Sequence, residues 1–342
     1  MKSLVRDIAR RPFVQRPAVA VPAALLLLFG ILVSGCGGNE VQSMLKTEGP
    51  AAREVAGLWW LMFALGGTVF VLVLALTVMA VFGRKSEDGP PLGPKRFVVI
   101  GGIIMPAVVL IVLLGFSLKS TFAIRLPESD LVIDVVGHQW WWEVSYPDEE
   151  IVIANEIYIP AGRPVRLRLT ASDVIHSFWV PSLHGKMDML PGKTNDFWIE
   201  ADVPGLYRGQ CAEFCGTQHA LMAFWVHALD PDEFDRWVEN RQTVSTTPET
   251  PQEARGYEVF FEAGCETCHA IDGTPAVGTA GPALTDISSR LTLGSGTIYN
   301  SRTNLANWIV NPQAVKPGNL MPNTHLSPED LEALIDYLDR LR

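Results

Sequence analysis

Two long stretches of the chain carry no charged residue. One lies between Glu54 and Arg84, and the other runs from 97 to 118. At 1.5 Å per helical residue, segments 58–82 and 97–118 extend for about 37 Å and about 33 Å, which exceeds the roughly 30 Å hydrocarbon core of a bilayer. The pattern predicts two membrane-spanning helices, the second kinked at Pro106.

The first 36 residues have the pattern of an export signal. A basic stretch precedes an apolar run at 18–33, which leads into Val-Ser-Gly-Cys36. These small residues resemble the lipobox of bacterial lipoproteins, and the resemblance implies that 1–35 is a cleaved signal peptide and that Cys36 is lipidated. A first transmembrane helix with an incidental cysteine is the alternative, although this run is short and contains Pro22.

Basic residues predict the orientation of the membrane hairpin, 36–125. The loop between the two spans holds Arg84, Lys85, Lys95 and Arg96. By the positive-inside rule this loop faces the cytoplasm, so the large C-terminal portion lies on the external face of a bacterial inner membrane.

Beyond the hairpin, the pattern changes to short alternating apolar segments broken by Pro and Gly, from 131 to 229. This spacing predicts an antiparallel β sandwich or barrel, in a domain at 126–240. A polar, Pro-containing linker at 241–252 leads to a last domain at 253–342. Ser327 followed by Pro, two acids and apolar residues at helical spacing predicts a C-terminal helix.

Composition narrows the class of protein. Hydrophobic residues make up 48% and charged residues 19% of the chain, and the mean hydropathy is +0.19. These values fit neither a fully soluble enzyme nor a disordered chain. Residues 119–342 carry 16 Lys and Arg against 31 Asp and Glu, a net charge of −15. This acidic portion argues against nucleic acid as a partner and favours a basic one.

Soft metal ligands gather at the end of the β domain. Cys211, Cys215 and His219 recur every four residues, Met222 follows, and His176 precedes them by 35 positions. Thiolates, imidazoles and a thioether suit copper far better than Mg²⁺ or Ca²⁺. Two cysteines, where a mononuclear blue-copper site has one, favour a pair of coppers bridged by both thiolates. A structural zinc site of two cysteines and two histidines is the alternative.

Three motifs carry a close resemblance to a known family. They are Asp173-Val-Ile-His-Ser-Phe-Trp-Val-Pro-Ser, Gly185-Lys-Met-Asp-Met-Leu-Pro-Gly and Gly205-Leu-Tyr-Arg-Gly-Gln-Cys-Ala-Glu-Phe-Cys-Gly-Thr-Gln-His-Ala-Leu-Met. Residues 40–229 resemble subunit II of the haem-copper cytochrome c oxidases. The resemblance implies a cupredoxin-like Greek-key β-sandwich that holds a binuclear copper A centre and docks on subunit I, which contains haem and copper B.

The same resemblance assigns roles to individual residues. It implies that Cys211 and Cys215 bridge the coppers, and that the backbone carbonyl of Glu213 is a further ligand. It also implies that the Glu213 side chain reaches a Mg²⁺ or Mn²⁺ at the interface with subunit I. The terminal ligands that it implies are His176, His219 and Met222.

An aromatic run, Trp140-Trp-Trp, and one missing carboxylate complete the comparison with this family. Composition alone favours an interfacial belt or a hydrophobic core for the three tryptophans. The resemblance instead implies that Trp140 lies over the copper centre and accepts incoming electrons.

Many family members carry a glutamate seven residues before the Pro of the second span, where it helps to admit protons. This chain has Val99 there.

The C-terminal domain contains Cys265-Glu-Thr-Cys268-His269, the attachment sequence of a c-type haem. Two thiols at this spacing reach the two vinyl groups, and the histidine supplies the proximal imidazole. A redox dithiol or half of a zinc site is the alternative. The domain resembles all-α class I cytochromes c, which implies that the Pro282 carbonyl orients His269 and that Met321 is the sixth ligand. Packing of Met321, with His325 as the ligand, is the other interpretation.

These observations predict a multidomain subunit II of a caa-type cytochrome c oxidase, the electron-transfer subunit of a proton-translocating terminal oxidase. A tethered haem domain stays at high effective concentration beside the copper site. It would receive electrons from a cytochrome or a quinol-oxidising complex and pass them to copper A and then to subunit I. Two alternatives stay open: a copper A relay for a nitric oxide reductase, and a non-catalytic copper-carrying lipoprotein.

Overall fold

The computed structural model describes residues 41–82 and 93–342. The predicted signal peptide, Cys36, Arg84 and Lys85 therefore lie outside the described residues. Within the described part, two helical segments are long and apolar enough to cross a membrane, Pro50–Phe82 and Pro94–Ala123, with mean hydropathies of 2.5 and 3.0. Both extend beyond the charge-free stretches that predict them.

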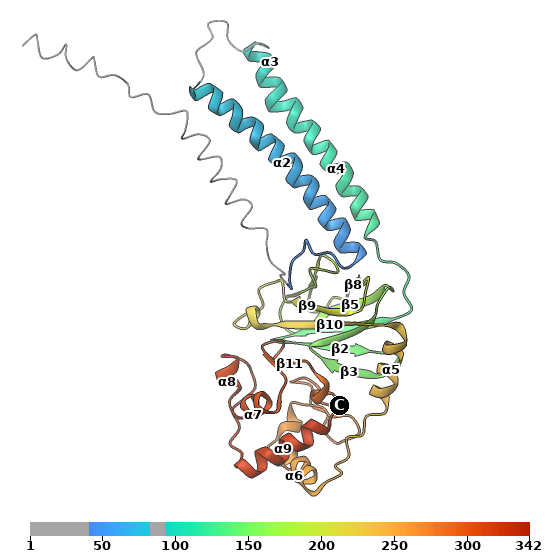
Figure 1. Ribbon diagram of the computed structural model, residues 1–342. Coiled ribbons are helices and arrows are strands. Elements are labelled where there is room, and N and C mark those ends of the chain that lie inside the picture. Colours follow the sequence, from blue (N-terminus) through green and yellow to red (C-terminus); the bar gives the residue numbers. More distant parts are fainter. Residues whose placement is uncertain (1–40, 83–92) are drawn as a thin grey trace, which may run out of the picture. The chain divides into compact units, whose positions relative to one another are not determined.

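The second of these segments, which Figure 1 labels as α3 and α4, is not a uniform helix. It consists of α3 (Pro94–Val99), a π-helical stretch η2 (Ile100–Ile104) and α4 (Met105–Ala123), while α2 (Pro50–Phe82) is continuous. The π-helical stretch ends just before Pro106. Proline has no N–H to donate and its ring clashes with the carbonyl four residues earlier, so a wider turn here relieves the helix.

The central domain consists of short strands in three sheets. The largest has the order β3-β2-β1-β5-β8, with β1 and β5 parallel and the other neighbours antiparallel. A second sheet has the order β4-β10-β9, and β6 pairs with β7. The strands are β1 (Val132–His138), β2 (Trp141–Tyr146), β3 (Ile151–Ala154), β4 (Glu156–Pro160), β5 (Val165–Ala171), β6 (His176–Trp179), β7 (Lys186–Met189), β8 (Asn195–Ile199), β9 (Gly205–Gln210) and β10 (Ala223–Leu229).

Alternating burial along the strands builds one core between the sheets. In β1 every second residue is buried, as period-2 alternation requires when one face of a sheet is covered. Trp142, Phe178 and Phe224 meet in this core, and the Phe178 and Phe224 rings are 4.7 Å apart. The helix α5 (Pro231–Gln242) follows β10.

The C-terminal domain is mainly helical. Its elements are α6 (Pro251–Glu262), η4 (Cys265–Thr267), η5 (Ile287–Ser289), β11 (Thr292–Leu293), β12 (Ile298–Tyr299), α7 (Arg302–Val310), α8 (Pro312–Val315) and α9 (Pro328–Arg340). The Thr250 hydroxyl and the Glu253 carboxylate form a capping box at the start of α6. Gly256 lets α6 and α9 cross closely, because a Cβ there would lie 2.0 Å from the Ala333 carbonyl oxygen.

The segment between α5 and α6 is held along this last domain. The Thr246 hydroxyl donates to the Asp272 carbonyl at 3.0 Å, and Arg340 Nε donates to the Thr247 carbonyl at 2.7 Å. Thr246 is itself buried. The polar composition that predicts a linker therefore does not leave this segment free of the domain.

Candidate copper and haem centres

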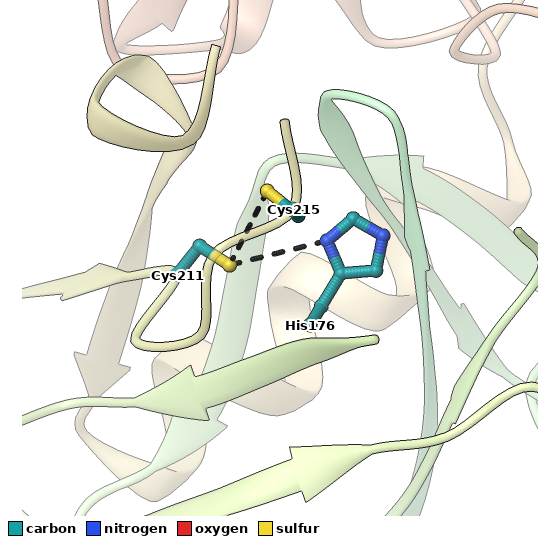
Figure 2. A group of neighbouring side chains, drawn as sticks. All are labelled: His176, Cys211 and Cys215. Carbon is teal, nitrogen blue, oxygen red and sulfur yellow. Dashed lines mark hydrogen bonds between the residues drawn. The ribbon is translucent and has the colours of Figure 1, made fainter. Parts of the chain in front are cut away.

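Five side chains and one carbonyl meet between β6 and the loop that follows β9. The Cys211 and Cys215 Sγ atoms are 3.7 Å apart, and Cys211 Sγ lies 3.9 Å from His176 Nδ1 (Figure 2). Cys215 Sγ lies 3.8 Å from both His219 Nδ1 and Met222 Sδ. Since ligand bonds of 2.0–2.3 Å keep two ligands of one metal within about 4.6 Å of each other, each of these neighbouring pairs is close enough to share a metal ion. The ligand atoms of His176, Cys211 and Cys215 all lie within 4.8 Å of one another.

Backbone hydrogen bonds fix the ends of the loop that carries four of these groups. The Cys211 N–H donates to the Met222 carbonyl at 2.9 Å, and the Ala212 N–H donates to the Ser177 carbonyl at 3.0 Å. The first bond ties the two ends of the loop together, and the second joins the loop to β6. Cys211 and Cys215 are each 2% exposed, and His176 is fully buried. Burial and these backbone hydrogen bonds together fix the positions of the ligand atoms.

Asp173 orients the first histidine of the site. The His176 Nε2 donates to the Asp173 carboxylate at 2.9 Å, so that Nδ1 faces the sulfur atoms with its lone pair available. The carboxylate is held in turn by the backbone N–H groups of Gln139 and Val174, at 2.7 Å and 2.6 Å. Burial lowers the pKa of His176, but hydrogen bonds with Cys211 and Asp173 outweigh it, and the net shift is upward.

Gly137 leaves the space in which this imidazole lies. A Cβ at this position would be 2.8 Å from His176 Cδ2 and 2.9 Å from Cγ. A larger residue at position 137 would push the His176 ring out of its place beside the sulfur atoms. The glycine before His138 is therefore a steric requirement of the site.

The hydrogen bond between the Cys211 and Cys215 thiols shifts their pKa values in opposite directions. The hydrogen bond between the two sulfur atoms, together with contacts to His176, lowers the pKa of Cys211. That same bond, with burial, raises the pKa of Cys215. A metal bridging both sulfurs would bind them as thiolates and displace their protons.

The structure places the two parts of Glu213 differently. Its carbonyl oxygen lies 3.2 Å from Cys211 Sγ, among the other ligand atoms. Its carboxylate points to the exposed Lys186, whose Nζ is 3.8 Å away. The carbonyl belongs to the cluster described above, whereas the carboxylate lies at the surface.

Trp140 directly contacts the loop from Cys211 to Met222, which we call the copper loop. Its indole Nε1 donates to the Cys215 carbonyl oxygen at 3.0 Å, and the Gln139 side-chain amide donates to the same oxygen at 2.8 Å. Trp142 is fully buried in the core, while the Trp141 ring stacks on His138 at 4.3 Å. Of the three tryptophans, only Trp140 donates a hydrogen bond to a cysteine of the cluster.

The haem-attachment motif borders a cavity of about 350 Å³ in the C-terminal domain. Cys265, Cys268, His269 and Met321 all line it, and so does Trp140. His269 Nδ1 donates to the Pro282 carbonyl at 2.7 Å, which leaves Nε2 for a metal. A Cβ on Gly281 would lie 2.6 Å from His269 Cε1, so this glycine shapes the cradle of the ring. The donor set and the cavity fit a covalently bound haem.

Asn319 holds the backbone that carries Met321. The Met321 N–H donates to the Asn319 side-chain carbonyl at 2.8 Å, and the Asn319 amide donates to the Lys316 and Pro312 carbonyls. His325, the alternative ligand, is exposed. The geometry therefore favours Met321 as the sixth ligand.

Sequence reasoning did not assign roles to Asp173, Gln139, Gly137 or Asn319. Asp173 has one usable signal, since a carboxylate three residues before a ligand histidine can reach its ring. The other three act through backbone and packing contacts that involve distant parts of the chain, and no spacing rule indicates them.

Two family models match the chain. Residues 149–229 match cytochrome c oxidase subunit II, periplasmic domain, and 253–342 match cytochrome c. The chain is 37% identical to the cytochrome c oxidase subunit 2 of Alkalihalophilus pseudofirmus, over 94% of this chain and 96% of that protein. It is 33% identical to that of Bacillus sp. PS3, over 93% and 97%.

Among solved structures, the periplasmic domain of subunit II of cytochrome oxidase of Bradyrhizobium japonicum is similar, with a TM-score of 0.34 and 33% identity. The match covers 34% of this chain and 97% of that one. With the two family models, the described elements confirm the predicted fold class: two apolar helices, a cupredoxin-like β-sandwich and a helical cytochrome c domain.

Proposed function

Because the chain belongs to the cytochrome c oxidase subunit 2 family and carries a fused cytochrome c domain, we propose that electrons reach the oxidase through its own haem c. From there they pass to a binuclear copper A centre and on to subunit I. The chain is a subunit of an oxidoreductase complex whose partners include subunit I. The proposal concerns the path of the electrons within it.

Each metal group would supply reversible one-electron chemistry, and the chain's residues would hold it. Cys211 and Cys215 would bridge the coppers. The remaining copper ligands would be His176, His219, Met222 and the Glu213 carbonyl. Cys265 and Cys268 would attach the haem, with His269 and Met321 as its axial ligands. A thioether axial ligand raises the haem potential, as a donor to an oxidase requires.

One observation carries this proposal: the Trp140 side chain belongs to both sites. It lines the cavity bordered by Cys265, Cys268 and His269, and its Nε1–H is bonded to the Cys215 carbonyl at 3.0 Å. A single aromatic residue thus spans from the haem cavity to a copper ligand residue. This supports Trp140 as the residue through which electrons reach the copper site.

Three finer assignments belong to the same proposal. The large domains lie on the external face of the membrane, Cys36 carries a lipid anchor, and the exposed Glu213 carboxylate binds Mg²⁺ or Mn²⁺ when subunit I covers it. The second span has no carboxylate between 97 and 118. Proton uptake through the glutamate position of the family, here Val99, would therefore need another group, or subunit I uses a different path.

Metal analysis of the purified chain tests the proposal. We expect two coppers and one covalent haem iron per chain, and an electron spin resonance signal split by two equivalent copper nuclei. Zinc in place of copper, or one copper at full occupancy, would overturn the copper A assignment. A co-purifying catalytic subunit that reduces nitric oxide and not O₂ would overturn the oxidase path.

A further inference from the structure

Lys316 is a buried lysine that joins the haem-binding domain to the copper-binding domain. Its side chain is 2% exposed. Its Nζ donates to the Trp140 carbonyl at 3.0 Å and to the Gly294 carbonyl at 2.9 Å. Trp140 belongs to the β domain, and Gly294 follows β11 of the C-terminal domain. One amine therefore holds a backbone segment from each domain.

A carboxylate from the β domain makes the reverse connection. Glu156, in β4, is fully buried. Its Oε1 accepts from the backbone N–H groups of Leu291 and Thr292, at 2.6 Å and 3.3 Å. Its Oε2 lies 2.8 Å from His227 Nε2 within its own domain. The segment that begins at Leu291 is thus bound by a carboxylate of the β domain.

The segment from Leu291 to Gly296, which we call the docking hairpin, also contacts the β domain through Ser295. The Ser295 hydroxyl donates to the Ala223 carbonyl at 2.7 Å, and the Ala223 N–H donates to the Ser295 carbonyl at 3.0 Å. A Cβ on Gly296 would lie 2.8 Å from the Ala223 Cβ. The backbones therefore approach more closely than any larger residue would allow.

These contacts are specific because their polar groups are buried. A buried donor or acceptor that loses its partner costs about 1–3 kcal/mol, so the amine, the carboxylate and the hairpin favour one arrangement over shifted ones. Burial lowers the pKa of Lys316 to about 7. The neutral amine still has an N–H for each carbonyl, so both bonds survive loss of the charge.

We propose that Lys316 is a positioning residue that fixes the haem-binding domain against Trp140, and thereby sets the approach of the haem site to the copper loop. This inference rests on the proposed electron path. The contacts of Lys316, Glu156 and Ser295 favour one docked arrangement of the haem-binding domain over free movement on its tether. The haem would supply one electron and the copper pair would accept that electron, while Lys316 would exchange no electron.

The variant Lys316→Met tests this in the complete oxidase complex, because methionine keeps the apolar stem and removes the amine. Lys193→Met, at an exposed lysine, is the matched control. We expect Lys316→Met to slow electron transfer from photoreduced haem to copper by at least about tenfold, which is about 1.4 kcal/mol of barrier. Covalent haem and copper contents, and direct reduction of each centre by a small reductant, stay unchanged.

Hydrogen exchange gives a second measurement that does not depend on electron transfer. We expect the amides of Leu291, Thr292 and Ala223 to exchange faster in Lys316→Met than in the wild type. In Lys193→Met their exchange rates should be unchanged. Absence of transfer in the wild-type protein would overturn the proposed function itself. Wild-type transfer with the same rate and the same exchange in Lys316→Met would overturn this inference alone. If Lys316→Met does not accumulate, Lys316→Leu, which also lacks a donor, carries both measurements, and wild-type values there overturn the inference.

Discussion

The indole N–H of Trp140 donates to the carbonyl oxygen of Cys215 at 3.0 Å. The preceding residue, Gln139, donates to the same oxygen. Two successive side chains of the β1–β2 turn are therefore anchored on the backbone of one cysteine. The contact gives the copper loop a direct hydrogen-bonded neighbour that also lines the haem cavity.

Substitution of Trp140 by phenylalanine should slow electron arrival at the copper site. The smaller ring loses the hydrogen bond to Cys215 but keeps an aromatic face in the cavity. We expect about a tenfold lower rate of haem-to-copper transfer, or about 1.4 kcal/mol of barrier, measured by flash photoreduction. Trp141→Phe is the control, since Trp141 lines the same cavity but stacks on His138. Equal rates in both variants would remove Trp140 from the path.

Asp173→Asn should weaken copper binding without removing a ligand. The amide is a poorer partner for the His176 N–H than the carboxylate, so the ring is less firmly oriented and less basic. Loss of such a supporting group typically costs 10–100-fold in metal affinity. Competition with a copper chelator measures the change, and Asp196→Asn serves as the control because Asp196 pairs with Arg166 at the surface. Unaltered affinity would show that His176 does not depend on Asp173.

Short sequence patterns predicted most of the fold and most of the candidate copper and haem ligands. Charge-free stretches, alternating strands and the Cys265–His269 motif each lie within a short segment, so the sequence alone revealed them. The loop from Cys211 to Met222 is also local, and a bond between its end residues closes it. Such features need no knowledge of distant contacts.

The contacts between domains could not be predicted in this way. Lys316 and Trp140 are 176 residues apart, and Glu156 and Leu291 are 135 apart. Nothing in the local composition of either segment indicates its partner. A lysine and a glutamate are ordinarily surface residues, so pattern reasoning assigns them to solvent. Their burial becomes visible only when the chain is folded.

Gly281→Ala should impair the haem site. The added methyl group would lie 2.6 Å from His269 Cε1 and 3.0 Å from Nδ1, so the ring must turn and its bond to the Pro282 carbonyl weakens. We expect a lower yield of covalent haem, and loss of the normal axial-ligand absorbance in what remains. Thr279→Ala, at an exposed position two residues earlier, should retain both. A normal spectrum in Gly281→Ala would mean that the ring does not occupy the position described.

Acidification should destabilise the β domain through His184. Its ring is buried against Phe197, at 4.3 Å, and Trp198, and burial lowers the pKa of His184 from 6.5 to about 4. The folded state therefore keeps this ring neutral while the unfolded chain binds a proton. The corresponding stability is fully present above pH 6.5 and is lost as the pH falls from 6.5 to about 4. Its upper bound is about 3 kcal/mol.

Thermal unfolding of the full chain in detergent, at several values between pH 7 and pH 4, measures this effect. Other groups titrate in the same range, so the informative quantity is the difference between the wild type and His184→Phe, which keeps a ring against Phe197. We expect the variant to lose less stability on acidification, because it has no imidazole to protonate on unfolding. His325→Phe, at an exposed histidine, should follow the wild type. If all three proteins lose stability in parallel, the buried His184 ring is not a source of acid sensitivity.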